Sequence, residues 1–209
     1  MKKVRKVCEN TFEKEAWAQG RYICGLDEAG RGPLAGPLSV AAVVFPIGYV
    51  NEDIYDSKAL SEKKREALYS VIMKDALWFE IMEVSREDID FCNIYRADQT
   101  AMTRLSDNAP ADLILTDAMK LPESEKQVTD IIKGDQKSIS IAAASILAKV
   151  TRDHIMKAYD EMYPGYGFAR NKGYGTKEHL AAIDELGITP IHRRSFAPVS
   201  HVQLKLDLF

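Results

Sequence analysis

The stretch G-L-D-E-A-G-R-G-P-L-A-G-P, residues 25–37, decides how this chain is built. An apolar segment, residues 21–26, has the length of a strand and runs into a loop rich in glycine and proline. Asp27 and Glu28 lie where the strand meets that loop. An acidic pair in an apolar setting is costly unless its carboxylates are paired or hold a cation. The simpler alternative is that strand alternation sends one side chain to solvent and the loop solvates the other.

The hydrophobic pattern around this stretch predicts strands in hairpin order, followed by strands that alternate with helices. The expected strands are 21–26, 38–45, 78–84, 112–116 and 128–132, and the expected helices are 61–74, 85–105, 138–163 and 176–186. This order is typical of an α/β fold with a mixed sheet and helices on its faces. From about residue 162 the chain is richer in glycine, tyrosine and basic residues. No clear linker precedes this part, so we expect one domain, residues 1–209, with a small C-terminal subdomain.

The composition is that of an ordinary globular protein. The 209 residues are 46% hydrophobic and 28% charged, with a net charge of −3, which excludes disorder, collagen and coiled coil as descriptions of the whole chain. No apolar run approaches the ~18–20 residues that span a bilayer, and no apolar segment of a secretion signal follows the basic N-terminus. Three widely spaced cysteines form neither a disulfide framework nor a metal knuckle. We therefore expect no membrane association and a cytoplasmic protein.

Charge is unevenly spread along the chain. Residues 22–148 carry a net charge of −8, whereas residues 1–21 carry +3 and residues 149–194 carry +2. Ordinary solvated charge explains this division. The sharper interpretation is that carboxylates gather around metal ions while the basic flanks grip phosphates.

Two further acids follow apolar segments. Asp117 ends the run A-D-L-I-L-T-D, and Asp135 follows I-I-K-G just before the long helix. Helix capping and the helix dipole are the alternative explanations. Together with Asp27 and Glu28 they make four carboxylates, with no cysteine or histidine at metal spacing. This donor set favours Mg²⁺ or Mn²⁺ over Zn²⁺. Two such ions about 3.5–4 Å apart can support phosphodiester hydrolysis.

Glycines flank a basic and an aromatic side chain at two points. Gly30, Arg31 and Gly32 directly follow the acidic pair, so the backbone there can approach a ligand and the arginine can fork onto phosphate. Tyr174 stands between two glycines and is suited to stack on a sugar or base. A plain turn and a core anchor are the respective alternatives.

Three other polar residues allow two interpretations each. Lys58, in D-S-K, and Arg194, in H-R-R-S, are candidates for contacts with a nucleic-acid backbone, although helix entry and a solvated loop also explain them. Asp153 lies four residues after Lys149, which favours a surface ion pair over a role near the metals. The small apolar residues of I-S-I-A-A-A-S-I-L-A, residues 139–148, suit tight packing of a helix on a sheet.

At the level of whole motifs, the sequence closely resembles bacterial ribonuclease HII, the type 2 ribonucleases H. The resemblance spans roughly residues 14–200 and rests on several motifs in the same order: the stretch at 25–37, D-S-K-A-L-S (56–61), L-T-D (115–117), K-G-D (133–135), S-I-A-A-A-S-I-L-A-K-V-T-R-D (140–153), N-K-G-Y-G-T-K-E-H (171–179) and H-R-R-S-F (192–196). It implies an RNase H-like mixed five-stranded sheet flanked by helices, with a small helical C-terminal part. It also implies cleavage of RNA in RNA–DNA hybrids and incision 5′ of ribonucleotides in duplex DNA, with two Mg²⁺ or Mn²⁺ ions and with 3′-OH and 5′-phosphate products.

The resemblance also assigns roles to individual residues. It makes Asp27, Glu28, Asp117 and Asp135 the metal-binding catalytic acids. It makes residues 30–32 readers of the ribonucleotide 2′-OH and Tyr174 a sensor of the RNA–DNA junction. Ala118 departs from the family, which more often has glycine after the third acid, so the shape of that loop is in question.

The last seven residues, Gln203–Phe209, resemble the short peptides with which bacterial repair proteins dock on the sliding clamp. A frayed tail, or one whose leucines pack on the protein itself, is the alternative. We expect a monomer.

Three other functions fit parts of the pattern. A resolvase or integrase would cleave DNA without needing a 2′-OH. A binding module or clamp adaptor would not need the acids, and the intact set of four argues against it. A phosphatase of small substrates would not need Arg31 or Tyr174.

Overall fold

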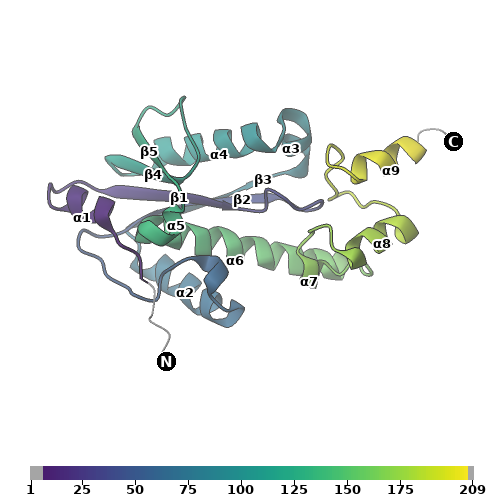
Figure 1. Cartoon of the computed structure of the whole chain (residues 1–209), viewed down its shortest axis with the longest axis horizontal. Coiled ribbons are helices and arrows are strands. Elements are labelled where there is room, and N and C mark those ends of the chain that lie inside the picture. Colours follow the sequence, from purple (N-terminus) through teal and green to yellow (C-terminus); the bar gives the residue numbers. More distant parts are fainter. Residues whose placement is uncertain (1–6, 207–209) are drawn as a thin grey trace.

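The computed structural model describes the backbone of residues 7–206 and the side chains of residues 7–202. Its middle layer is a sheet in the order β3-β2-β1-β4-β5 (Figure 1). The strands are β1 (Ile23–Ala29), β2 (Leu38–Val44), β3 (Trp78–Val84), β4 (Leu113–Asp117) and β5 (Gln127–Ile131). β1 to β3 pair antiparallel, while β4 lies parallel to β1, and β5 lies parallel to β4. The predicted mixed five-stranded sheet is confirmed.

Helices cover both faces of this sheet (Figure 1). On one face lie α3 (Arg86–Cys92) and α4 (Ile94–Asn108), and on the other lie α2 (Glu62–Asp75) and the long α6 (Ile139–Met162). Short elements fill the connections: α1 (Thr11–Trp17), the 3-10 turn η1 (Ser57–Ala59) and α5 (Gly134–Lys137). Beyond the end of α6 lie α7 (Phe168–Asn171), α8 (Lys177–Leu186) and α9 (Val199–Leu206). No helix within residues 7–206 has the length and apolarity to cross a bilayer.

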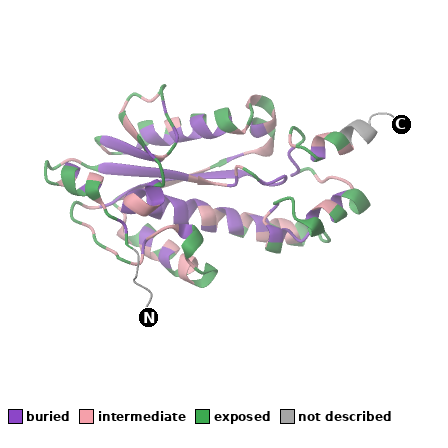
Figure 2. Ribbon diagram, in the orientation of Figure 1, coloured by how far each residue is buried: buried purple, intermediate pink, exposed green. Residues whose placement is uncertain are grey.

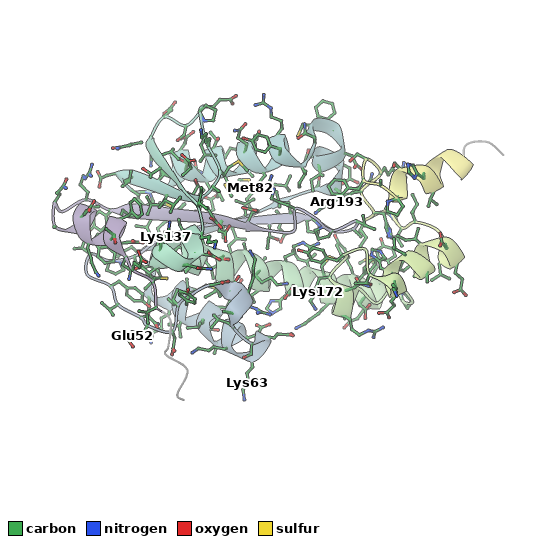
Figure 3. The ribbon with its side chains drawn as sticks, in the orientation of Figure 1. Glu52, Lys63, Met82, Lys137, Lys172 and Arg193 are labelled. Carbon is green, nitrogen blue, oxygen red and sulfur yellow. The ribbon has the colours of Figure 1, made fainter. Side chains whose placement is uncertain are left out.

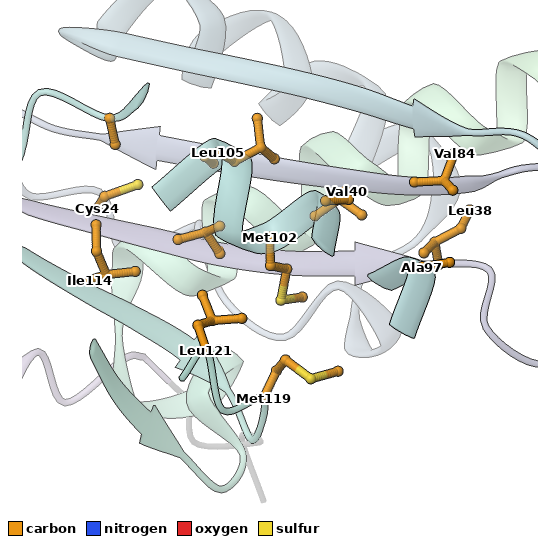
Figure 4. Packing of buried hydrophobic residues seen from close by; sticks show 14 of the residues in the cluster. Cys24, Leu38, Val40, Val84, Ala97, Met102, Leu105, Ile114, Met119 and Leu121 are labelled. Carbon is orange, nitrogen blue, oxygen red and sulfur yellow. The ribbon is translucent and has the colours of Figure 1, made fainter. Parts of the chain in front are cut away.

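Strand alternation divides the core into two layers. Along β2, Leu38 and Val40 pack toward α4 (Figure 4), whereas Ala41 and Val43 pack toward α6. All seven residues of β2 are buried because the strand is covered on both faces (Figure 2). The alanine-rich first half of α6 is buried as well, which confirms the packing role predicted for residues 139–148.

The hydrophobic pattern did not predict the N-terminal helix α1. Side chains of α1 and of the residue before it accept hydrogen bonds from the first residues of α6. Glu13 is fully buried, and its Oε1 accepts hydrogen bonds from the Ser138 hydroxyl and from the Ser140 N–H. Asn10 accepts another from the Ile139 N–H, at 2.9 Å. These acceptors satisfy N–H groups that a helix start leaves open.

Two sequence-based boundaries were wrong. The expected helix 85–105 is broken at Asn93, whose φ is 66° and whose side chain caps α4 by accepting from the N–H groups of Tyr95 and Arg96. β1 does not end before the acidic pair but continues to Ala29, because Asp27 and Glu28 pair with Ala41 and Val40 of β2.

Candidate active site

The acidic pair lies on opposite faces of β1. Asp27 faces α6, as does Gly25, whereas Glu28 faces α4, because successive strand residues alternate. Asp27 is 7% exposed, and its Oδ1 accepts the Glu28 N–H at 2.9 Å. Alternation therefore does not send either carboxylate freely into solvent, since both faces of β1 are covered.

Asp117 and Asp135 are linked through Gly134, the residue that precedes Asp135 and hydrogen-bonds to Asp117. Asp117 is the last residue of β4, and its Oδ1 accepts the Gly134 N–H at 2.9 Å. Asp135 follows in α5 and is 5% exposed. Ala118 adopts the left-handed conformation, with φ of 56°. The loop thus keeps a shape that glycine would adopt more easily, and Asp117 still ends the strand.

A cavity of about 280 Å³ opens between these elements. Its lining comes from the end of β1 and the following loop, from η1, from the end of β4, from α6 and from the loop before α8. The lining residues are Asp27, Glu28, Ala29, Gly30, Arg31, Gly32, Ser57, Lys58, Asp117, Ser145, Lys149, Arg152 and Tyr174. The cavity therefore brings together all but two of the residues predicted from the sequence. The exceptions are Asp135, which lies beside Asp117, and Arg194.

Burial and mutual repulsion raise the pKa of three of the acids. Burial, then the charge of Glu28, raises the pKa of Asp27 well above its usual value, although a hydrogen bond with Ser145 opposes the shift. Burial and the neighbouring Asp98 raise the pKa of Glu28 to about 7. Burial, with Asp56 and Asp117, raises the pKa of Asp135 to about 6. Carboxylates that lie this close together favour the binding of a cation that neutralises their charge.

Two buried guanidinium groups hold the segment 30–37, which begins with the loop of residues 30–32. Arg193, which is labelled in Figure 3, is 0% exposed. It donates to the carbonyl oxygens of Gly30 at 2.6 Å and of Arg31 at 3.0 Å, and also to those of Gly36 and Pro37. Arg152 donates to Pro37, Ala35 and Lys172. Gly30 has a φ of 107°, and a Cβ there would lie 2.1 Å from the Arg152 Nε, so only glycine fits.

Tyr174 is 46% exposed and lines the cavity. Its carbonyl oxygen accepts from the Nδ1 of His179 at 2.9 Å. The Nε2 of His179 in turn lies 3.0 Å from that of His192, whose Nδ1 accepts the Thr189 N–H. This pattern requires two neutral imidazoles. Accordingly, burial lowers the pKa of His179, and burial together with His179 lowers that of His192 to about 4.

The remaining predicted residues lie at different places. Lys58 is exposed at the cavity wall. Arg194 is exposed outside it, and its N–H donates to Asp90 at 2.9 Å. The expected pair of Lys149 and Asp153 forms, at 2.6 Å. It is not a plain surface pair, however, because Asp153 is 4% exposed and Lys149 lines the cavity.

Asp98 of α4 was missed by the sequence analysis. Its side chain is 0% exposed and its Oδ2 lies 3.5 Å from the Arg31 Nε. Burial raises its pKa to about 7, with Arg31 opposing the shift. A signal was present, because Asp98 shares a helical stripe with Ala101, Met102 and Leu105. A lone acid on such an apolar stripe indicates a buried charge with a partner elsewhere.

The donor set fits a hard divalent cation in kind, since it consists of carboxylate oxygens whose charges lack full compensation. Within residues 7–202, no three histidine, cysteine, aspartate or glutamate side chains already stand close enough together to enclose an ion. All three cysteines are free thiols.

Solved structures share this fold. Ribonuclease H2 from Pyrococcus horikoshii matches with a TM-score of 0.76 and 23% identity, over 89% of this chain and 99% of its own. An Archaeoglobus fulgidus PCNA:RNase HII complex matches with a TM-score of 0.70 and 27% identity, over 82% and 93%. Bst-RNase HIII in complex with Mn²⁺ matches with a TM-score of 0.65 and 19% identity, over 93% and 73%. These likenesses define the class of the fold, which is the one that the type 2 and type 3 ribonucleases H share.

The sequence comparisons narrow this class to one family. The family model for ribonuclease HII matches residues 24–199. A ribonuclease HII from Listeria monocytogenes is 51% identical over 199 residues, which cover 94% of this chain and 76% of the relative. The chain belongs to the ribonuclease HII family, and it is a hydrolase that cleaves the RNA strand of RNA–DNA hybrids.

Proposed function

We propose that the cavity is the active site at which this enzyme also incises duplex DNA 5′ of an embedded ribonucleotide, leaving 3′-OH and 5′-phosphate ends. The observation that carries this proposal is the meeting of two kinds of group in one cavity. Crowded carboxylates with raised pKa values lie beside the loop of residues 30–32 and Tyr174. The first group suits phosphodiester hydrolysis, and the second suits recognition of the strand.

Asp27, Glu28, Asp117 and Asp135 are the residues that hold the metal ions in this proposal. Burial and mutual repulsion leave the negative charge of these acids poorly compensated by the protein. A divalent cation would neutralise that charge. When bound, two Mg²⁺ or Mn²⁺ ions supply activation of the attacking water and stabilisation of the departing 3′ oxygen. The Mn²⁺ complex of a structurally similar RNase HIII supports this choice of metals.

The loop of residues 30–32 reads the ribonucleotide. The 2′-OH is the group by which a protein tells RNA from DNA, and a glycine-flanked backbone lets peptide groups come within hydrogen-bond reach of it. Arg193 fixes the loop through the carbonyl oxygens of Gly30 and Arg31, and Arg152 fixes the segment that follows it through the carbonyl oxygen of Pro37. Tyr174 presents its ring at the cavity, where it stacks on the sugar that follows the ribonucleotide.

Basic side chains around the cavity hold the strand. Lys58 and Lys149 line it, and both suit phosphate as point charges. Arg194 lies outside the cavity and is exposed, so we assign it to the flanking duplex. A short positive footprint of this kind is enough for binding, although the chain as a whole is acidic.

The test uses a labelled DNA duplex with one ribonucleotide, an all-DNA duplex as control, and Mg²⁺, Mn²⁺ or chelator. We expect a metal-dependent nick 5′ of the ribonucleotide. Asp27→Asn should lose at least about a hundredfold in rate, since a metal-bound transition state is stabilised by several kcal/mol. Nicking of the all-DNA control would indicate a resolvase-like enzyme instead. Folded protein that binds hybrid but never nicks would contradict the proposal.

We also propose that residues 203–209 dock on a bacterial sliding clamp. Residues 207–209 of this tail, and the side chains of 203–206, lie outside the described residues. The complex of an Archaeoglobus RNase HII with PCNA supports the idea of a clamp partner. Deletion of residues 203–209 should abolish clamp binding in a pull-down while leaving nicking intact, and clamp binding that survives the deletion contradicts the proposal.

We further propose that the enzyme works as a monomer of one domain in the cytoplasm. Two buried arginines and the cluster around Phe168 join the C-terminal part to the rest, which supports a single domain. Three free cysteines support a reducing compartment.

A further inference from the structure

Asp98 is a carboxylate that the proposed reaction does not use. Its side chain is 0% exposed, and neither of its oxygens has a hydrogen-bond partner among the described residues. A buried carboxylate without hydrogen bonds is costly. A neighbouring cation can offset that cost.

Arg31 is the cation beside it. The Arg31 Nε lies 3.5 Å from the Asp98 Oδ2, and the guanidinium carbon lies 5.9 Å from the centroid of the Tyr95 ring. Glu28 is the third neighbour, but its Oε1 is 3.9 Å from the Arg31 Nη1, which is longer than a hydrogen bond. Because the ion pair with Asp98 is made on the Nε side, the two terminal nitrogens of Arg31 remain for a ligand in the cavity.

We propose that Asp98, assisted by the Tyr95 ring, is a positioning residue that presents the terminal nitrogens of Arg31 to the backbone of the ribonucleotide-containing strand. This inference rests on the proposed function, in which Arg31 contacts the ribonucleotide-containing strand. Asp98 stands outside the set of four acids. A preset guanidinium plane raises affinity, because a free arginine would lose side-chain entropy on binding.

The variant Asp98→Asn distinguishes a positioning role from a purely electrostatic one, because the two predict changes of Kd in opposite directions. Removal of a negative charge beside a phosphate site would by itself strengthen binding. Asp184→Asn, at an exposed position of α8, controls for the change in net charge. Loss of positioning weakens binding instead. We expect the Kd of a fluorescent duplex with one ribonucleotide, measured by anisotropy without metal, to rise about tenfold, as for one charge-assisted hydrogen bond.

The Tm of the Asp98→Asn variant tests whether Asp98 has a merely structural role. Arg31 is 41% exposed, so water solvates it when Asp98 is neutralised, and the buried charge is gone. Asp98→Asn should therefore leave the Tm unchanged or higher. A lower Tm together with an unchanged Kd would overturn the proposal.

Two further variants test whether Asp98 acts through Arg31. On an Arg31→Ala background, or Arg31→Lys if that variant does not fold, Asp98→Asn should have no additional effect on Kd. Tyr95→Phe should bind like the wild type because it keeps the ring, whereas Tyr95→Ala should bind about threefold more weakly. A loss that persists without Arg31, or a Kd that falls, contradicts the proposal.

The nicking assay keeps this inference separate from the proposed function. Absence of a metal-dependent nick by the wild type contradicts the proposed function alone. The Kd series needs no turnover, so it decides the role of Asp98 in either case.

Discussion

At the scale of single residues, the site is governed by how poorly its carboxylates are compensated. Protons and metal ions compete for the same oxygens, because a carboxylate binds metal only when it is ionised. The pKa of Glu28 is raised to about 7 and that of Asp135 to about 6. Both groups therefore hold protons at pH values where ordinary carboxylates have lost them.

Metal affinity should consequently fall steeply in mild acid. We expect the Kd of Mn²⁺, measured by calorimetry, to rise at least about tenfold between about pH 7.5 and about pH 5.5, with proton release on binding. The sign follows from the raised pKa values, since the protonated fraction grows as pH falls through 7. Glu28→Gln should bind more weakly and with a shallower pH dependence, and equal affinity at both pH values would show that the acids do not bind the metal.

The four acids could be predicted because each lies next to an apolar segment, and this local context already marks it as a charge near the core. Asp98 could not be read as a partner of Arg31, since the two are 67 positions apart and meet only when α4 packs on the sheet.

At the scale of elements, the close approach of α6 to β1 positions the site. A Cβ at Gly25 would lie 2.2 Å from the backbone carbon of Ser140, so the helix backbone lies directly on the strand. The same approach brings Ser145 to Asp27. The long helix was predicted to within one residue, whereas the break at Asn93 was not, because a capping asparagine in a continuous polar–apolar pattern resembles an ordinary helical position.

Gly25→Ala should push α6 off the strand. We expect a loss of roughly 3 kcal/mol in the free energy of unfolding, because the clash is with a helix backbone that cannot yield. Gly32→Ala is the matched control, since a Cβ there meets only Tyr174, at 3.6 Å, and should change stability by less than about 0.5 kcal/mol. Urea titrations followed by circular dichroism measure both. Equal losses in the two variants would contradict this account of the contact.

At the scale of the whole molecule, the C-terminal part and the sheet are joined through Arg193. Its guanidinium reaches four carbonyl oxygens of the segment 30–37, and its own N–H donates to Leu34 at 2.8 Å. Burial, and the charge of Arg152, lower its pKa to about 9, so it remains charged at neutral pH.

Arg193→Met should weaken the whole fold and the recognition loop together. We expect a loss of about 3 kcal/mol or more, since buried carbonyl oxygens are left without donors, and a fall in hybrid cleavage larger than the unfolded fraction explains. Arg170→Met is the control, because its pair with Glu178 is exposed and should contribute little to stability. Denaturation and hybrid cleavage measured on the same samples decide the matter, and a stable Arg193→Met variant with full activity would refute the role.

The features that could be predicted from the sequence are local ones. Periodicity indicated the strands and the long helix, and the place of Asp27, Glu28, Asp117 and Asp135 next to apolar segments indicated oxygen ligands for a hard cation, because each of these signals lies within a short stretch of chain. Which charges lie together became known only from the packed structure. The pairing of Asp98 with Arg31, and the hold of Arg193 on residues 30–37, depend on distances between segments far apart in the chain. The physical reason is that the energy of a buried charge depends on its surroundings, which do not exist until the helices and the sheet have packed.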